Sequence, residues 1–223
     1  MTAAASIRLA DYTPWAFELP TIALDVTIQD DHVVVASRLS LEPRRPGEPL
    51  ELCGVDLAIE SLAIDQAPLQ PEDYSFTDGR LTIPNVPGQP FVLETCCRLD
   101  PYSNSSLEGL YASSGLLSTQ CEAEGFRRIS LHPDRPDVLS RWQVRIEASR
   151  SSCPVLLSNG NAVREESVGA HRHAVTWDDP FPKPSYLFAL VAGDLREIRD
   201  HYTTASGRQV TLRLHVEEGD EPF

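Results

Sequence analysis

Short runs of alternating apolar and polar residues recur along the chain. A period of two places successive side chains on opposite faces of a β-sheet, whereas an amphipathic helix repeats every 3.6 residues. The runs predicted to form strands are residues 21–28, 32–41, 50–64, 80–86, 90–99, 141–149, 154–160, 173–177, 186–193 and 209–216. Pro, Gly and Asp interrupt them at intervals of about 10 residues, which is typical of a sandwich or barrel. The pattern predicts an all-β fold.

Two other local signals stand out between the strands. Residues 134–142 are the one predicted helix, because Asp134 is a candidate N-cap, Pro136 suits a first turn and Leu139 follows three residues later. Residues 158–161 read Ser-Asn-Gly-Asn, and Asn and Gly tolerate positive φ, so a hairpin turn is predicted there.

Length and charge limit the classes of protein to which the chain can belong. Its 223 residues suffice for one large all-β domain, or for one domain and the beginning of another. A formal net charge of −14 argues against binding to nucleic acid or anionic membranes, since both require cationic surface. No apolar run approaches membrane-spanning length, and the first twenty residues lack a charged segment followed by an apolar one. A cytoplasmic location is therefore predicted.

The five cysteines lack the density and spacing of a disulfide framework. They are Cys53, Cys96, Cys97, Cys121 and Cys153. Cys96 and Cys97 are adjacent in a predicted strand, which directs them to opposite faces. Free thiols with structural roles are predicted.

The histidines and serines predict no metal site and no catalytic nucleophile. No histidine pair has the i, i+4 spacing of a helical zinc site. His171 and His173 would share a face of a strand, yet no third ligand accompanies them, so a solvated strand is favoured over a metal site. His132 precedes a proline and is expected in a loop with a hydrogen-bonding role. The Gly-x-Ser-x-Gly elbow of serine hydrolases is absent.

Residues 118–124 contain Gln120, Glu122 and Glu124 at a spacing of two. If this stretch is a strand, the three side chains lie on one face, where the two carboxylates repel each other. The repulsion is small in water and costly in a cleft unless a cation lies between them. Three interpretations remain open: an exposed acidic strand edge, ion pairs with Arg127 or Arg128, and a bound cationic ligand.

Three blocks of sequence resemble a known family. Residues 104–142, 156–161 and 177–195 resemble the N-terminal domain of the bacterial aminopeptidase N family, which are zinc aminopeptidases of the gluzincin group. Residues 12–41 are similar to the opening strands of that domain. The resemblance covers nearly the whole chain, and it implies a saddle- or sandwich-like all-β domain.

The resemblance also implies roles for single residues. Glu122 is expected to meet the α-ammonium group of a peptide substrate, and Gln120 to line the pocket for the first side chain. The cation that residues 118–124 require is then the substrate itself. No role carries over to Glu124, for which an ion pair with a neighbouring arginine is the preferred interpretation.

The family's His-Glu-x-x-His zinc motif and Gly-Ala-Met-Glu-Asn motif belong to its next, thermolysin-like domain, and neither occurs in this sequence. We expect an N-terminal β domain in residues 1–195 and the opening hairpin of the catalytic domain in residues 196–223. Zinc is expected in the full-length enzyme only, so this chain alone is predicted to be inactive. The expected partners are a peptide N-terminus and the enzyme's own catalytic domain. The alternative function is a stand-alone β-sandwich module that binds peptide N-termini or a protein partner.

Overall fold

The computed structural model describes residues 8–221 and confirms the all-β prediction. Within this range the regular structure is seventeen strands in four sheets, and the helical elements are short 3-10 turns. These turns are η1 (Leu9–Asp11), η2 (Gly125–Arg128) and η3 (Ser185–Leu187).

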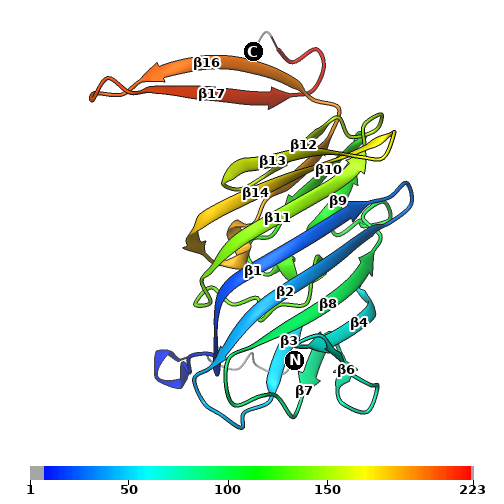
Figure 1. Ribbon diagram of the computed structural model, residues 1–223, viewed down its shortest axis with the longest axis vertical. Coiled ribbons are helices and arrows are strands. Elements are labelled where there is room, and N and C mark those ends of the chain that lie inside the picture. The colour runs from blue at the N-terminus through cyan, green and yellow to red at the C-terminus, as the bar shows by residue number, and fades with distance from the viewer. Residues whose placement is uncertain (1–7, 222–223) are drawn as a thin grey trace, which may run out of the picture.

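A large twisted sheet runs along the molecule, and a four-stranded and a three-stranded sheet lie against it (Figure 1). The eight-stranded sheet comprises, in spatial order, β13 (Asn161–Val168), β14 (Arg172–Lys183), β11 (Ser140–Ser149), β1 (Phe17–Ile28), β2 (Val33–Pro43), β8 (Phe91–Leu99), β4 (Ala58–Ile64) and β5 (Ala67–Pro68). The four-stranded sheet comprises β12 (Val155–Ser158), β15 (Leu190–Gly193), β10 (Leu116–Gln120) and β9 (Gly109–Ser113). The three-stranded sheet comprises β3 (Leu50–Cys53), β7 (Arg80–Ile83) and β6 (Ser75–Thr77).

One face of the eight-stranded sheet is buried. Side chains along β8 and β11 alternate between buried and more exposed positions, as a half-buried strand requires. The buried face shares one apolar core with the smaller sheets, to which Ile22, Val144, Leu117 and Leu81 contribute. Each fully buried Leu or Ile stabilises the fold by about 1.5–3 kcal/mol relative to an exposed one. The result is the sandwich-like arrangement that the sequence predicts.

The chain leaves the large sheet after β8 and returns to it with β11. Strand β11 pairs in parallel with β1, with Ile22 opposite Trp142, whereas the other pairings in this sheet are antiparallel. A parallel pair cannot be closed by a tight hairpin, so a long connection is required. The connection between β1 and β11 spans residues 29–139, and its last part, residues 100–139, carries β9, β10 and η2 and contains the predicted site residues.

The last two described strands form a separate hairpin. Strands β16 (Arg196–Thr203) and β17 (Gln209–Val216) pair with each other over their whole length and with no other strand in residues 8–221. The hairpin extends beyond the end of the large sheet (Figure 1). The strand predicted at 209–216 is thus confirmed, while the division of the chain into domains at residue 195 stays a prediction.

Two local predictions are wrong because distant contacts override local signals. Residues 134–142 form no helix: Asp134 has a positive φ of 48° and a buried carboxylate that binds other segments, and β11 begins at Ser140. Residues 158–161 make a turn but no hairpin, since β12 and β13 belong to different sheets. Gly160, with φ of 85°, is required there, because a Cβ would lie 2.2 Å from the Asp178 carbonyl oxygen.

Several strand boundaries also differ from the prediction. Residues 50–64 form two strands, β3 and β4, in different sheets, and Asp56 between them has a positive φ of 55°. Strand β13 was not predicted, because most of its side chains are exposed on both faces and no alternation marks it. The cysteine predictions are confirmed: all five thiols are free, and Cys97 is buried while Cys96 faces the other side near Glu60.

Candidate functional site

The candidate site is the turn that follows β10. Strand β10 ends at Gln120, so Glu122 and Glu124 do not continue its face, as a strand over 118–124 would require. Cys121 is buried under the turn, whereas Gln120, Glu122 and Glu124 are exposed. The three side chains are therefore neighbours in an exposed turn and not members of one strand face.

Glycine makes this turn possible. The Gly125 N–H donates to the Cys121 carbonyl oxygen at 2.9 Å and closes the turn. A Cβ at Gly125 would lie 2.4 Å from the Gln120 carbonyl oxygen and 3.0 Å from the Gly109 nitrogen. Because these contacts are with backbone atoms, a larger residue would force β9 and β10 away from η2. The close approach ends β10 and turns the chain at Gln120.

The two carboxylates of the turn differ in their surroundings. Glu124 Oε2 lies 3.1 Å from Arg127 Nη2, which confirms the predicted ion pair with a neighbouring arginine. The Glu122 carboxylate has no ion-pair partner among residues 8–221. Gln120 Nε2 donates to the Glu122 backbone carbonyl at 3.3 Å, which places the Gln120 amide beside Glu122. One carboxylate of the turn is thus neutralised and the other is not.

A buried carboxylate anchors η2 below the turn. Asp134 Oδ2 accepts hydrogen bonds from Arg127 Nε at 2.9 Å and from the Arg127 backbone N–H at 3.2 Å. Asp134 Oδ1 accepts from Ser185 Oγ at 2.7 Å. The Asp134 side chain is 0 % exposed, so its charge depends on these donors. We call Asp134, Arg127 and Ser185 the Asp134 clamp.

His132 supports the clamp from within the core. Its Nδ1 accepts the Asp134 backbone N–H at 2.9 Å, so the ring is unprotonated at Nδ1, and it has the hydrogen-bonding loop role that the sequence predicts. Burial lowers the pKa of His132 to about 4, although the Asp134 carboxylate opposes this shift. The ring packs against Phe126 with centroids 5.0 Å apart, and Phe126 also packs edge-on against Trp142 and Phe188, each at 5.1 Å.

The Cys121 thiol and the close histidine pair, His171 and His173, do not form a catalytic or metal site. Burial raises the pKa of the Cys121 thiol to about 12, so the thiolate that a nucleophile requires is disfavoured. His171 is exposed, but His173 is buried and its Nε2 lies 2.8 Å from the Cys153 carbonyl oxygen, so the predicted solvated strand is wrong for His173. Within residues 8–221, no group of three or more His, Cys, Asp or Glu side chains could hold a metal ion.

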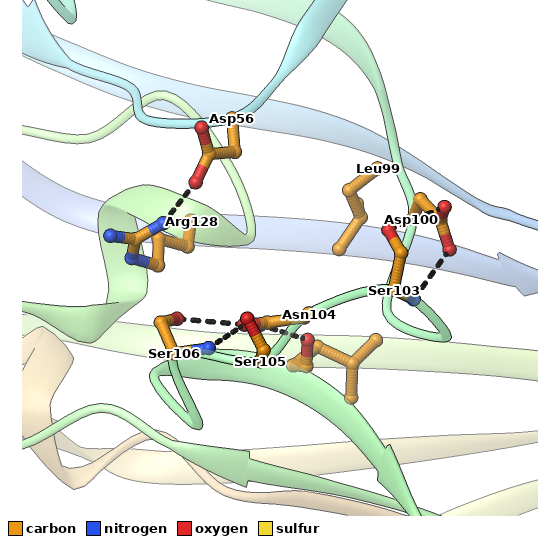
Figure 2. A pocket seen from close by; sticks show the side chains of 9 residues that line it. Asp56, Leu99, Asp100, Ser103, Asn104, Ser105, Ser106 and Arg128 are labelled. Atoms are coloured by element: carbon orange, nitrogen blue, oxygen red, sulfur yellow. Dashed lines mark hydrogen bonds and ion pairs between the residues drawn. The ribbon is translucent and has the colours of Figure 1, made fainter.

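A cavity of about 470 Å³ lies beside η2, between Asp56 and residues 99–110 (Figure 2). Arg128 points across it and pairs with Asp56. On the opposite wall, the Asn104 side-chain oxygen accepts hydrogen bonds from the Ser106 backbone N–H at 3.0 Å and from Ser106 Oγ at 2.7 Å. These polar groups satisfy one another, so we assign the cavity no ligand.

None of the helices in residues 8–221 has the length and apolar character needed to cross a membrane.

The sequence did not reveal the Asp134 clamp. Arg127, Asp134 and Ser185 are polar residues without a recognisable spacing, and Ser185 lies far from the other two along the chain. The sequence signals near them were Asp134 as a candidate N-cap and Arg127 as one of two candidate ion-pair partners for the glutamates, and neither signal indicated the clamp. Burial of Asp134, which depends on tertiary packing, is what distinguishes it from the other aspartates.

Comparison with known proteins identifies this domain. Residues 90–187 match the family model of the Peptidase M1 N-terminal domain. The chain is 50% identical over 217 residues to the aminopeptidase N of Caulobacter vibrioides, and 43% identical over 211 residues to that of Escherichia coli. These alignments include 96% and 94% of this chain, but only 25% and 24% of the relatives. The chain thus spans about a quarter of the length of the curated relatives it matches.

Solved structures show the same fold. Legionella pneumophila aminopeptidase A, in complex with aspartic acid, matches 95% of this chain and 25% of its own, with a TM-score of 0.89 and 33% identity. An M1 zinc metallopeptidase from Deinococcus radiodurans matches 92% of this chain and 48% of its own, with a TM-score of 0.77 and 16% identity. Residues 90–187 therefore match the Peptidase M1 N-terminal domain family, and the similarity of the chain to the bacterial aminopeptidases N extends over nearly its whole length.

Proposed function

We propose that this chain is the N-terminal domain of a zinc-dependent aminopeptidase, a metallopeptidase that removes N-terminal residues from peptides, and that it contributes recognition of the substrate's α-amino group. The observation that carries the proposal is the difference between the two carboxylates of the turn. Glu124 is paired with Arg127, while Glu122 is exposed and has no ion-pair partner within residues 8–221. An unpaired carboxylate is the group that a cationic ligand requires.

The chemistry of an exopeptidase fits this arrangement. An enzyme that cleaves only the first residue must recognise a free chain end, which carries an ammonium group near neutral pH. Glu122 accepts hydrogen bonds from that ammonium, and such charge-assisted bonds are roughly twice as strong as neutral ones. Gln120, whose amide lies beside Glu122, borders the pocket for the first side chain. When the catalytic domain covers the turn, the lower local dielectric strengthens the ion pair further.

Zinc does not fit the residues of this chain, since residues 8–221 contain no suitable ligand cluster. When bound in an enzyme of this kind, zinc polarises the scissile carbonyl and activates water. We propose that the rest of a longer enzyme binds it, as the Legionella and Deinococcus proteins extend well beyond the part that matches this chain. The contribution of this chain is then to bind and orient the peptide.

The test is a chimeric enzyme in which residues 1–223 replace the matching N-terminal quarter of the Caulobacter vibrioides aminopeptidase N. The same junction made with the Escherichia coli N-terminal quarter is the positive control for the fusion. We expect Glu122→Ala to lower kcat/KM by roughly ten- to more than a hundredfold, since a hydrogen bond to a charged group contributes about 1.5–3 kcal/mol. Glu124→Ala is the matched control and should change kcat/KM far less.

Two further measurements examine the roles of Glu122 and Gln120. Binding that depends on the ammonium weakens as pH rises past about 8, where peptide α-amino groups titrate, and Glu122→Ala should reduce this dependence. Gln120→Ala should shift the preference among first side chains and leave recognition of the chain end intact.

Equal effects of the two glutamate variants would contradict the proposal. An inactive chimera with a folded N-terminal part, beside an active positive control, would favour the stand-alone binding module.

A further inference from the structure

The turn that presents Glu122 has few contacts of its own. Its side chains at Glu122 and Glu124 are exposed, and its closing backbone hydrogen bond runs from Gly125 to Cys121. A carboxylate that binds an ammonium at a defined place needs a turn with one conformation, because a displacement of about 1 Å can cost a hundredfold in rate. The contacts that hold the turn must therefore come from outside it.

These contacts form a continuous path from the turn into the core. Arg127 binds Glu124 through Nη2 and Asp134 through Nε, so one guanidinium joins the exposed turn to a buried carboxylate. The backbone N–H of Arg127 is bound to the same Asp134 oxygen, which holds η2 as well as the side chain. The other Asp134 oxygen is bound to Ser185, in the segment that leads to β15.

The clamp is rigid at its buried end and adjustable at its exposed end. Asp134 is fully buried, while the Arg127 side chain is 23 % exposed and that of Glu124 67 % exposed. A planar guanidinium with several donors can satisfy both carboxylates at once, which a lysine ammonium does less well. Arg127 also neutralises Glu124, which leaves Glu122 as the carboxylate of the turn that is open to a cation.

We propose that Arg127 and Asp134 are positioning residues: they hold the turn Cys121–Glu124 in the conformation that places the Glu122 carboxylate for an ammonium group. This inference rests on the proposed function, because it assigns the purpose of the clamp to ammonium binding. Neither residue touches the substrate. They act chiefly through the backbone of η2, to which the exposed Glu124 ion pair adds a weaker contact.

The first experiment measures the turn in the 223-residue chain itself. The method is backbone amide hydrogen exchange followed by NMR. The exchange rate of the Gly125 amide reports opening of the turn, because this N–H closes it. The amides of β1 report global unfolding and are the reference. Arg127→Gln and Asp134→Asn should accelerate exchange at Gly125 by about tenfold more than exchange at the β1 amides, which report any loss of global stability. Asp134→Asn keeps the side-chain shape and is the second variant should Arg127→Gln fail to fold.

Arg128→Gln is the matched control. Arg128 is the next residue of η2 and has nearly the same exposure, but it pairs with Asp56 and Glu108 and with neither partner of Arg127. We expect wild-type exchange at Gly125 in this variant. Equal acceleration of Gly125 exchange in Arg127→Gln and Arg128→Gln would overturn the inference. Unchanged Gly125 exchange in both Arg127→Gln and Asp134→Asn would also overturn it.

The second experiment uses the chimeric enzyme. Arg127→Gln should lower the melting temperature, since it leaves the buried Asp134 carboxylate without its cation, so kinetics are measured well below that temperature, where the variant is folded. Under these conditions Arg127→Gln should raise KM about tenfold, because misplacement of Glu122 weakens binding in every folded molecule. A merely structural role would instead lower the active fraction, so that kcat falls and KM stays constant. A normal KM in Arg127→Gln, together with a lowered kcat/KM in Glu122→Ala, would refute the positioning role of the clamp and leave the proposed function standing. Normal kinetics in Glu122→Ala would refute the proposed function, and with it the purpose given to the clamp.

Discussion

Arginines bind several carboxylates in two regions of this molecule, the open face of the large sheet and the segment around η2. On the sheet, Arg145 of β11 binds Asp25 of β1, Glu147 of its own strand and Glu166 of β13 at distances of 2.8–3.2 Å. Asp25 lies directly opposite Arg145 in the β1–β11 ladder. The backbone pairing thus brings these side chains together, and the ion pairs follow from it.

Around η2, by contrast, the side-chain ion pairs hold the backbone in place. No ladder connects residues 121–139 to a neighbouring strand beyond the single bridge between Cys53 and His132. The contacts of Arg127 with Glu124 and Asp134 replace the missing ladder. Loss of an ion pair on the sheet should therefore leave the backbone structure there unchanged. Loss of an ion pair of Arg127 should instead change the geometry of the turn.

The largest effect is expected where η2 meets the core. Phe126→Ala should destabilise the 223-residue chain by about 3–5 kcal/mol, since a large-to-small change in a packed core leaves a cavity. Phe126 is 0 % exposed and packs against three rings. Urea unfolding followed by circular dichroism measures the change. Phe181→Ala, at a position that is 76 % exposed, is the control, and a similar loss there would contradict the comparison.

Acid should weaken the η2 region next. The pKa of His132 is lowered by burial to about 4, against an ordinary value of 6.5. The unfolded chain therefore binds the proton more readily, and stability falls as pH decreases from 6.5 through about 4, by about 3 kcal/mol at pH 4.

The measurement is urea unfolding at a series of pH values between 7 and 4. His132→Gln removes the titrating group and should flatten this part of the profile, whereas His171→Gln, at an exposed position, should not. An identical slope in wild type and His132→Gln would show that other groups control acid stability.

A smaller effect is expected on the sheet. Arg145→Gln should cost about 1 kcal/mol, because surface ion pairs contribute little individually and the β1–β11 ladder remains in place. Its side chain is 26 % exposed and has three partners, so we expect somewhat more than for an isolated pair. Thermal unfolding at low and high salt measures the loss, which should shrink as salt increases. A change of strand register seen by NMR would contradict the comparison.

The smallest effect on stability is expected at the turn surface. Glu124→Ala should lower the free energy of unfolding by less than about 0.5 kcal/mol, since the Glu124 side chain is 67 % exposed. The same substitution should accelerate exchange at Gly125 measurably, though less than Arg127→Gln does. A variant with lower stability and unchanged exchange would show that the ion pair does not hold the turn.

Much of the fold could be predicted from alternation. Strands β1, β2, β8 and β11 have one buried face, and a half-buried strand needs a period of two in its apolar residues. Strand β13 escaped prediction because it is an edge strand with little burial on either face. The predicted helix at 134–142 failed because the Asp134 carboxylate, a good N-cap by local rules, is bound by Arg127 and Ser185 instead.

The sequence by itself determined the all-β class, the buried faces of the long strands and, through resemblance, Gln120 and Glu122 as the candidate site. Only the tertiary structure decided which carboxylate is free. The spacing of Gln120, Glu122 and Glu124 suggested one strand face, but close packing of Gly125 on Gln120 ends the strand there. Whether a carboxylate is paired depends on where the arginines are held. Arg127 is held by Asp134, whose buried position and bond to Ser185 exist only once the core has formed, because segments distant in sequence supply its neighbours.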